Sequence, residues 1–177
     1  MSPATWTRVI AAGSPDEFAA AQRLLAEYYT WAIAEAGLDT TLSELVPSVA
    51  RELANLADHY VPPTAYLLLA WVDDDPVGVC AVERIAESAA ELKRLYVAPD
   101  ARGYGIGGRL VTRVAELARE MGCQTLRLDT HEGIMQPAIA LYRRFGFEPS
   151  ERCTDIDVDH MVGFALDLTT WREPAGR

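Results

Sequence analysis

The segment APDARGYGIGGRLVTRVAELARE, residues 98–120, constrains the fold more than any other part of the chain. It holds four glycines within six residues, namely Gly103, Gly105, Gly107 and Gly108, followed by an amphipathic pattern without Gly or Pro. Glycine lets a ligand approach the backbone closely, and a helix N-terminus carries unpaired N–H groups and a partial positive charge. The segment therefore predicts a phosphate-binding turn at the start of a helix. An ordinary glycine-rich turn is the weaker alternative.

The other patterns predict an α/β fold with a mixed, largely antiparallel sheet flanked by helices, in one domain over residues 1–177. Apolar, β-leaning runs predict strands at 5–12, 64–72, 76–85, 90–97, 124–130 and 161–168. Ser14 and Glu17 form a capping box for a first helix that ends at Gly37. A second helical region follows Thr41 and is kinked or split by Pro47. Two further helices are expected at 108–122 and 136–146.

Composition excludes several classes of function. A net charge of −10 argues against nucleic-acid binding, yet basic residues gather between Lys93 and Arg119, which favours a small anionic ligand there. We expect the later arginines, Arg113 and Arg119, to lie on a solvated helix face. The three cysteines are far apart, which predicts a reducing, cytoplasmic location, and His and Cys lack metal-ligand spacing. No apolar run is long enough for a membrane span, and the first residues do not resemble a signal peptide.

A dinucleotide site is one alternative for the glycine loop. Gly103, Gly105 and Gly108 satisfy G-x-G-x-x-G, and Asp129 ends the next strand, about where a ribose-binding acid belongs. In the dinucleotide fold, however, the strand runs directly into the first glycine, whereas residues 98–102 intervene here, and no second mononucleotide half follows. A P-loop fails because the chain has no G-K-[ST].

A third interpretation rests on three segments that occur in register. ARGYGIGGRL resembles the R-x-x-G-x-G loop of the GNAT acetyltransferase superfamily, ELKRLYVAP resembles that family's preceding strand, and AIALYRRFGFEP resembles its last motif. Together they cover about residues 62–168. The resemblance implies a GNAT-like acyl-CoA N-acyltransferase fold and transfer of an acetyl group from acetyl-CoA to a primary amine, by direct attack in a ternary complex.

The resemblance also implies the residues of the site. The pyrophosphate of the cosubstrate would bind the loop formed by Arg102, Gly103, Tyr104, Gly105, Ile106, Gly107 and Gly108, with N–H groups pointing at the phosphate oxygens. The strand would offer backbone groups at Leu95 and Val97, on either side of Tyr96. Tyr142 would be the general acid; the alternative is that it is an aromatic residue that only packs in the core. Glu91 would be the base, with Glu83 or a water relay as rivals.

Other features stay open. Many relatives carry Asn where this chain has Met135, so a polar contact to the cofactor is expected to be missing or replaced. Residues 131–137, with His131 and Glu132, form a long connection that we interpret as a loop rather than a substrate site. The acceptor, a small-molecule or peptide amine, cannot be identified from the sequence, nor can the oligomeric state, for which a homodimer is one option. A non-catalytic acyl-CoA sensor is the alternative function.

Overall fold

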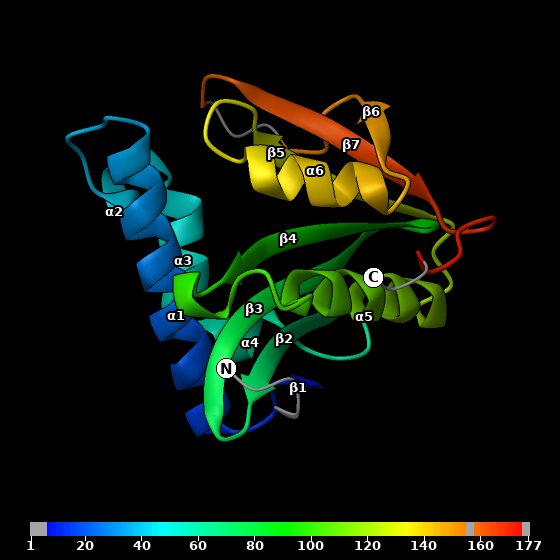
Figure 1. The fold of residues 1–177 in the computed structure, drawn as a ribbon, viewed down its shortest axis with the longest axis horizontal. Coiled ribbons are helices and arrows are strands. Elements are labelled where there is room, and N and C mark those ends of the chain that lie inside the picture. Colours follow the sequence, from blue (N-terminus) through cyan, green and yellow to red (C-terminus); the bar gives the residue numbers. More distant parts are fainter. Residues whose placement is uncertain (1–6, 155–157, 175–177) are drawn as a thin grey trace.

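A seven-stranded mixed sheet forms the centre of the computed structural model, which describes residues 7–154 and 158–174 (Figure 1). The strand order is β1-β2-β3-β4-β5-β7-β6. The strands are β1 (Thr7–Ala11), β2 (Ala65–Val72), β3 (Asp75–Ala86), β4 (Ala89–Val97), β5 (Thr125–His131), β6 (Glu148–Ser150) and β7 (Met161–Asp167). All neighbours pair antiparallel except β4 and β5, so the predicted fold class is confirmed.

The helices cover both faces of this sheet. They are α1 (Pro15–Glu35), α2 (Leu42–Leu45), α3 (Pro47–Ala54), α4 (Leu56–His59), α5 (Ile106–Glu120) and α6 (Gln136–Arg144), with a 3-10 turn at Pro99–Ala101. Buried residues of α5 and α6 pack with one side of the strands, and those of α1, α3 and α4 pack with the other. None of the helices in the described part of the chain is both long and apolar enough to cross a membrane.

Local sequence rules account for most of the boundaries. The capping box of Ser14 and Glu17 opens α1 as predicted, and Gly37 follows α1 with φ of 68°. Pro47 starts α3, so the second helical region is split rather than kinked. The first predicted strand begins at Thr7 within the described residues, and positions 5 and 6 lie outside them.

Two details differ from the sequence prediction. The short strand β6 was not predicted, because its three residues carry no alternation and pair only with one edge of β7. Helix α5 begins at Ile106, two residues earlier than expected. Gly107 and Gly108 therefore belong to its first turn, where their lack of a side chain lets α6 approach: a Cβ on Gly107 would lie 3.2 Å from Leu141.

The place where β4 leaves β5 shapes the rest of the molecule. The two strands pair only over Ala89–Glu91 and Thr125–Arg127. Further along β4 the register to β3 shifts between Val79 and Ala81, and Arg94 takes a left-handed φ of 62°. One extra residue in one strand is a β-bulge, which bends that strand. Figure 1 shows the result: β4 meets the β5–α6–β7 unit at the right and separates from it towards the left.

Candidate functional site

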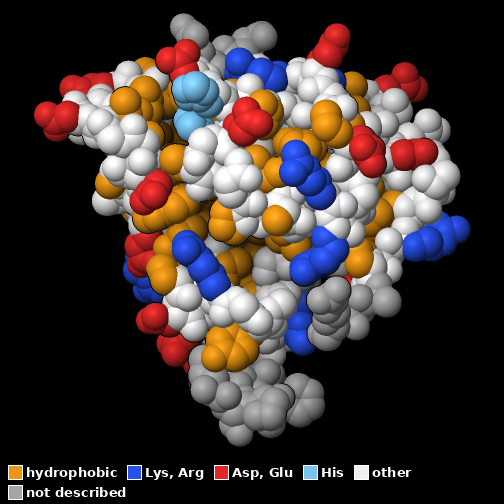
Figure 2. Space-filling view, turned by 45° about the horizontal axis from the view of Figure 1, so that its top comes forward, with side chains coloured by type: hydrophobic (Ala, Val, Ile, Leu, Met, Phe, Trp, Pro, Cys, Tyr) orange, Lys and Arg blue, Asp and Glu red, His pale blue; other side chains and the backbone are white. Residues whose placement is uncertain are grey.

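A cleft of about 1070 Å³ lies where β4 and β5 have separated. It is lined by the whole loop from Arg102 to Gly108, the end of β4, the start of α6, two aromatic residues of α1 and residues 173–174 near the C-terminus. Figure 2 looks onto this part of the surface, where Lys and Arg side chains surround a hollow lined by hydrophobic ones. The cleft is therefore suited to a ligand with both anionic and apolar parts.

The glycine loop presents its backbone to this cleft. Gly103 and Gly105 have φ of 83° and 78°, a conformation that L side chains rarely adopt, and a Cβ added at either would meet nothing within 4 Å. The first hydrogen bond of α5 runs from the Arg109 N–H to the Gly105 carbonyl. The N–H groups of the preceding turn therefore have no partner inside the helix, as an anion site requires.

Arg102 departs from the expected arrangement of the loop. Its N–H donates to the Pro99 carbonyl at 3.2 Å and is not free for a phosphate. Its side chain donates from Nε to the Val97 carbonyl at 2.9 Å, and its guanidinium lies 5.7 Å from the ring centre of Trp31. We therefore assign Arg102 to holding the loop against the end of β4.

The backbone of β4 alternates in direction beyond the bulge. The Ala98 N–H donates to Val77 of the preceding segment, so the backbone groups of Tyr96 also point towards β3. Those of Leu95 and Val97 point to the other side, which β5 has left open. The Val97 carbonyl already accepts a hydrogen bond from Arg102. The backbone groups of Leu95 are therefore more available to a ligand than those of Val97.

Tyr142 lies on α6 at the edge of the cleft rather than in its lining. The residue is 5% exposed, and its ring lies 5.6 Å from that of Phe147. Its neighbours Ala138 and Leu141 line the cleft. Burial, together with the nearby Cys80 thiol and Tyr28 phenol, raises the pKa of Tyr142 well above its usual value. The phenol thus keeps its proton at neutral pH.

Glu91 faces a second pocket, of about 480 Å³, between β4 and the helices α3 and α4. The residue is 8% exposed and its carboxyl group has no hydrogen-bond partner among the residues described. Burial raises the pKa of Glu91, and the nearby Lys93 and Arg94 offset only part of that rise. A carboxylate with a raised pKa is a better proton acceptor, so this environment is suited to a base.

Glu83, the rival of Glu91, is already engaged. Its Oε2 accepts from Lys93 Nζ at 2.5 Å and lies 3.4 Å from His59 Nε2. The side chain is 30% exposed, in contrast to Glu91. Of the two carboxylates, Glu91 is therefore the one without a bound cation.

A buried ion pair holds the bulge of β4. Arg94 donates to both carboxylate oxygens of Glu52, from Nε at 2.9 Å and from Nη2 at 2.6 Å, and the Tyr60 hydroxyl donates to the same carboxylate. Burial alone would raise the pKa of Glu52, but Arg94, Lys93 and Tyr60 outweigh it and lower the pKa to about 2. No signal in the sequence identifies this pair, because 42 residues separate its members and neither belongs to a motif.

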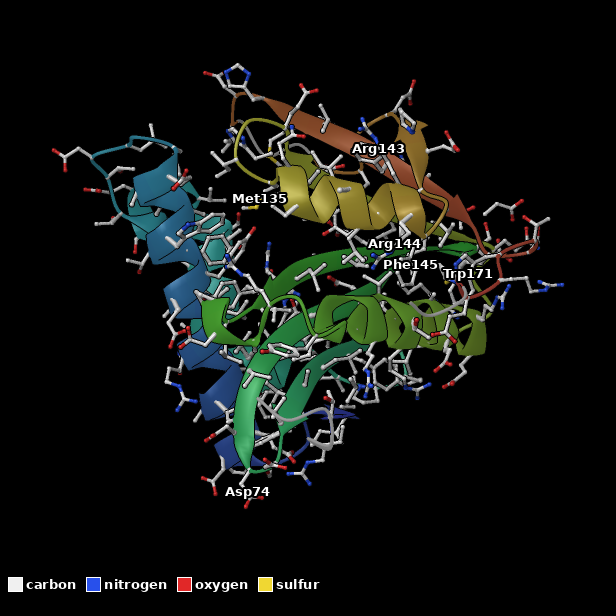
Figure 3. All side chains as sticks on the ribbon, viewed as in Figure 1. Asp74, Met135, Arg143, Arg144, Phe145 and Trp171 are labelled. Carbon is white, nitrogen blue, oxygen red and sulfur yellow. The ribbon has the colours of Figure 1, made fainter. Side chains whose placement is uncertain are left out.

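The arginines of the basic segment have several different roles. Figure 3 shows Arg144 between α6 and α5, beside Phe145, with Arg143 on the opposite side of α6. Arg144 and Arg109 line the cleft, which the sequence did not single out. Arg113 is exposed and pairs with two glutamates of its own helix, as expected. Arg119 is also exposed, as expected, and in addition it donates to the Leu168 and Trp171 carbonyls and so anchors the C-terminal segment.

The connection before α6 also contributes to the cleft. Ile134 and Met135 line it, and Met135 occupies the N-cap of α6 without a capping side chain. Figure 3 shows Met135 at the end of α6 that faces the top of α1. His131 and Glu132 are not among the lining residues of either pocket. In residues 7–154 and 158–174 there is no group of three or more His, Cys, Asp or Glu that could hold a metal ion.

Known proteins resemble this chain in both sequence and fold. A model of the acetyltransferase (GNAT) family matches residues 23–147. An uncharacterised N-acetyltransferase of Schizosaccharomyces pombe is 31% identical over 137 residues, which cover 76% of this chain and 81% of that protein.

Two solved structures share the fold. An acetyltransferase from Streptococcus agalactiae has a TM-score of 0.72 at 22% identity, over 91% of this chain and 98% of that one. The PaiA N-acetyltransferase of Thermoplasma acidophilum, in complex with coenzyme A, has a TM-score of 0.69 at 18% identity, over 92% and 99%.

We predict that Glu52→Gln destabilises the fold by about 3 kcal/mol, because Arg94 would keep a buried charge without its counter-ion. The matched control is Glu116→Gln, which breaks the exposed pair with Arg113 and should cost less than about 1 kcal/mol. Chemical denaturation at neutral pH measures both. Equal effects of the two substitutions would contradict a structural role for the buried pair.

The pair of Glu52 and Arg94 also predicts how the stability of the fold changes at low pH. The pKa of Glu52 in the folded protein, about 2, lies below the ordinary value of 4.5. The stabilisation is therefore complete above the ordinary pKa and is lost as the pH falls towards the folded one. The difference in stability between wild type and Glu52→Gln should shrink between about pH 5 and pH 2.

Proposed function

Because the chain belongs to the acetyltransferase (GNAT) family, we propose that it transfers the acetyl group of acetyl-CoA to a primary amine by direct attack in a ternary complex. Membership of this family shows that the chain is an acyltransferase. The identity of the cosubstrate, the class of acceptor and the mechanism of transfer are what we propose. The observation that carries it is the opening between β4 and β5, with the glycine loop in one pocket and Glu91 in another.

The cleft fits coenzyme A. The glycine loop supplies unpaired N–H groups at a helix N-terminus for the pyrophosphate, and Arg109 and Arg144 add positive charge beside them. The apolar floor and the free backbone groups of Leu95 suit the uncharged arm that leads to the thioester. When bound, acetyl-CoA supplies an activated carbonyl and a thiol leaving group.

We assign the acceptor amine to the second pocket, because β4 borders both pockets within a few residues. Lys93 and Arg94 line the second pocket, and Leu95 to Val97 line the cleft. An amine of the lysine type has a pKa near 10.4 and arrives protonated at neutral pH. Glu91, whose pKa is raised by burial and only partly offset by Lys93 and Arg94, accepts that proton, directly or through a water molecule.

Tyr142 acts at the opposite side of the reaction. Its neutral phenol, with a raised pKa, donates a hydrogen bond or a proton to the departing sulfur. Among the described residues the hydroxyl has no hydrogen-bond partner that would compete for this role. The support for the assignment is its position beneath Ala138 and Leu141, which line the cleft.

A turnover assay tests the proposed function. Acetyl-CoA should raise the thermal midpoint of unfolding, because a ligand of the native state stabilises it, and a panel of primary amines should release free thiol. Stabilisation by acetyl-CoA without any thiol release would favour the non-catalytic sensor. A response to NADH in place of acetyl-CoA would favour the dinucleotide site.

Gly105→Val should weaken acetyl-CoA binding by about tenfold or more, because a side chain there projects into the phosphate space and strains a backbone at φ of 78°. The matched control is Gly37→Val, with φ of 68° and equally open surroundings but outside the cleft. Calorimetric titration of both folded variants separates backbone strain from loss of the site. The assignment of the loop is wrong if the two variants bind acetyl-CoA equally well.

Tyr142→Phe should lower kcat by roughly 10²-fold while acetyl-CoA affinity stays nearly unchanged, because the ring still packs and only the proton donor is lost. The loss should become smaller at high pH, where the departing thiol needs no proton. Steady-state kinetics from pH 6 to 10 measure it. The control is Tyr66→Phe, which removes a phenol from β2 outside both pockets.

A Tyr142→Phe variant within twofold of wild type at every pH would make Tyr142 a packing residue. Glu91→Gln completes the test, because it keeps the size of the side chain and removes the proton acceptor. If that variant is equally active, catalysis by side-chain acid and base is wrong, and positioning with water as the proton carrier replaces it.

A further inference from the structure

The described residues that line the pocket of Glu91 carry mostly polar or charged side chains, and this bears on the acceptor. Its volume of about 480 Å³ is that of a small-molecule site. Among the described lining residues, Val49 is the only one with an aliphatic side chain, and none is a Phe, Tyr or Trp. An acceptor with an aromatic ring would find no aromatic side chain to stack on among these residues. The lining therefore selects a small, hydrophilic amine.

Three of the charged groups that line this pocket, Glu52, Lys93 and Arg94, are already compensated by one another and by the adjacent Glu83. Arg94 is paired with Glu52, and Lys93 lies 2.5 Å from Glu83 and 3.7 Å from Glu52. These four groups carry two positive and two negative charges, so the network is neutral. Its carboxylates are therefore not available to attract a cationic acceptor, although the sequence makes the region look acidic.

Three charged groups of the lining remain without a partner among the described residues: Arg51, Asp58 and Glu91. Arg51 lies on α3 and is the one unpaired cation among the described lining residues. Asp58 lies on α4, and Glu91 lies on β4. An unpaired cation and two unpaired carboxyl groups together complement a ligand with an anionic and a cationic group.

We infer, on the basis of the proposed function, that the acceptor is a small polar amino acid, whose carboxylate Arg51 binds and whose ammonium group faces Glu91 and Asp58. A guanidinium binds a carboxylate through two parallel hydrogen bonds, which gives direction as well as charge. The same contact orients the amine towards the side of β4 that borders the cofactor cleft. Polyamines have no group for Arg51, and arylalkylamines have neither a carboxylate for Arg51 nor an aromatic side chain to stack on among the described lining residues.

The experiment compares matched acceptors. Small polar L-amino acids, each paired with its own amide, are assayed by thiol release together with 2-phenylethylamine and spermidine. The amide keeps the side chain and removes the carboxylate charge; because it also lowers the pKa of the amine, rates are compared at equal concentrations of the unprotonated amine. We expect kcat/KM about tenfold higher for the amino acids than for their amides, as for one hydrogen bond to a charged group.

Variants then assign that preference to one residue. Arg51→Gln should lower the ratio of kcat/KM for amino acid over amide about tenfold, mainly through KM, and Arg51→Lys should restore part of it. The matched control is Arg23→Gln, which removes an exposed arginine of α1 outside both pockets and should leave the ratio unchanged. An unchanged ratio in Arg51→Gln would overturn the role of Arg51.

The outcomes separate this inference from the proposed function. Preference for the amides, for 2-phenylethylamine or for spermidine would overturn the amino-acid acceptor and leave an acetyltransferase of another specificity. No thiol release with any amine would instead overturn the proposed function. Calorimetric titration of the amino acids into the complex with coenzyme A tests the pocket without turnover: binding weakened by Arg51→Gln supports the inference, and no binding overturns it.

Discussion

The short pairing between β4 and β5 is the constraint on which the rest of the structure depends. Three residues of each strand pair in parallel, and the bulge at Arg94 then bends β4 away. A strand that loses its neighbour leaves backbone groups unpaired, and these must find another partner. Here the open edge borders the cleft, and Arg102 satisfies one of its carbonyls. Because β4 separates from β5, the two pockets border neighbouring stretches of β4.

The bulge itself requires support from outside the sheet. A non-glycine residue with positive φ is strained, and Arg94 also carries a charge into a nearly buried position. Glu52 on α3 compensates the charge with two hydrogen bonds, and Tyr60 adds a third to the carboxylate. A buried ion pair contributes little net stability, but removal of one partner is costly. Its role here is to fix where β4 turns.

Local electrostatics, rather than the net charge, decide what this acidic chain can bind. The chain has a formal charge of −10, yet the loop at the start of α5 offers N–H groups and is bordered by Arg109 and Arg144. Contacts of this kind act at short range, whereas distant surface charges are screened by salt. In the second pocket, Arg94 and Lys93 neutralise Glu52, whereas Asp58 and Glu91 have no ion-pair partner among the described residues.

The sequence by itself determined most of the elements and the glycine loop, because those signals are local. The capping box at Ser14, the break at Pro47 and the glycines before α5 act within a few residues of each other, and the motif around Tyr142 is equally local. Only the tertiary structure decided which charges remain free. It paired Glu52 with Arg94 and Glu83 with Lys93, and it left Glu91 and Arg51 without partners in the part of the chain that the structure describes. Such pairings depend on how α3 packs on β4, and no spacing along the chain encodes that distance.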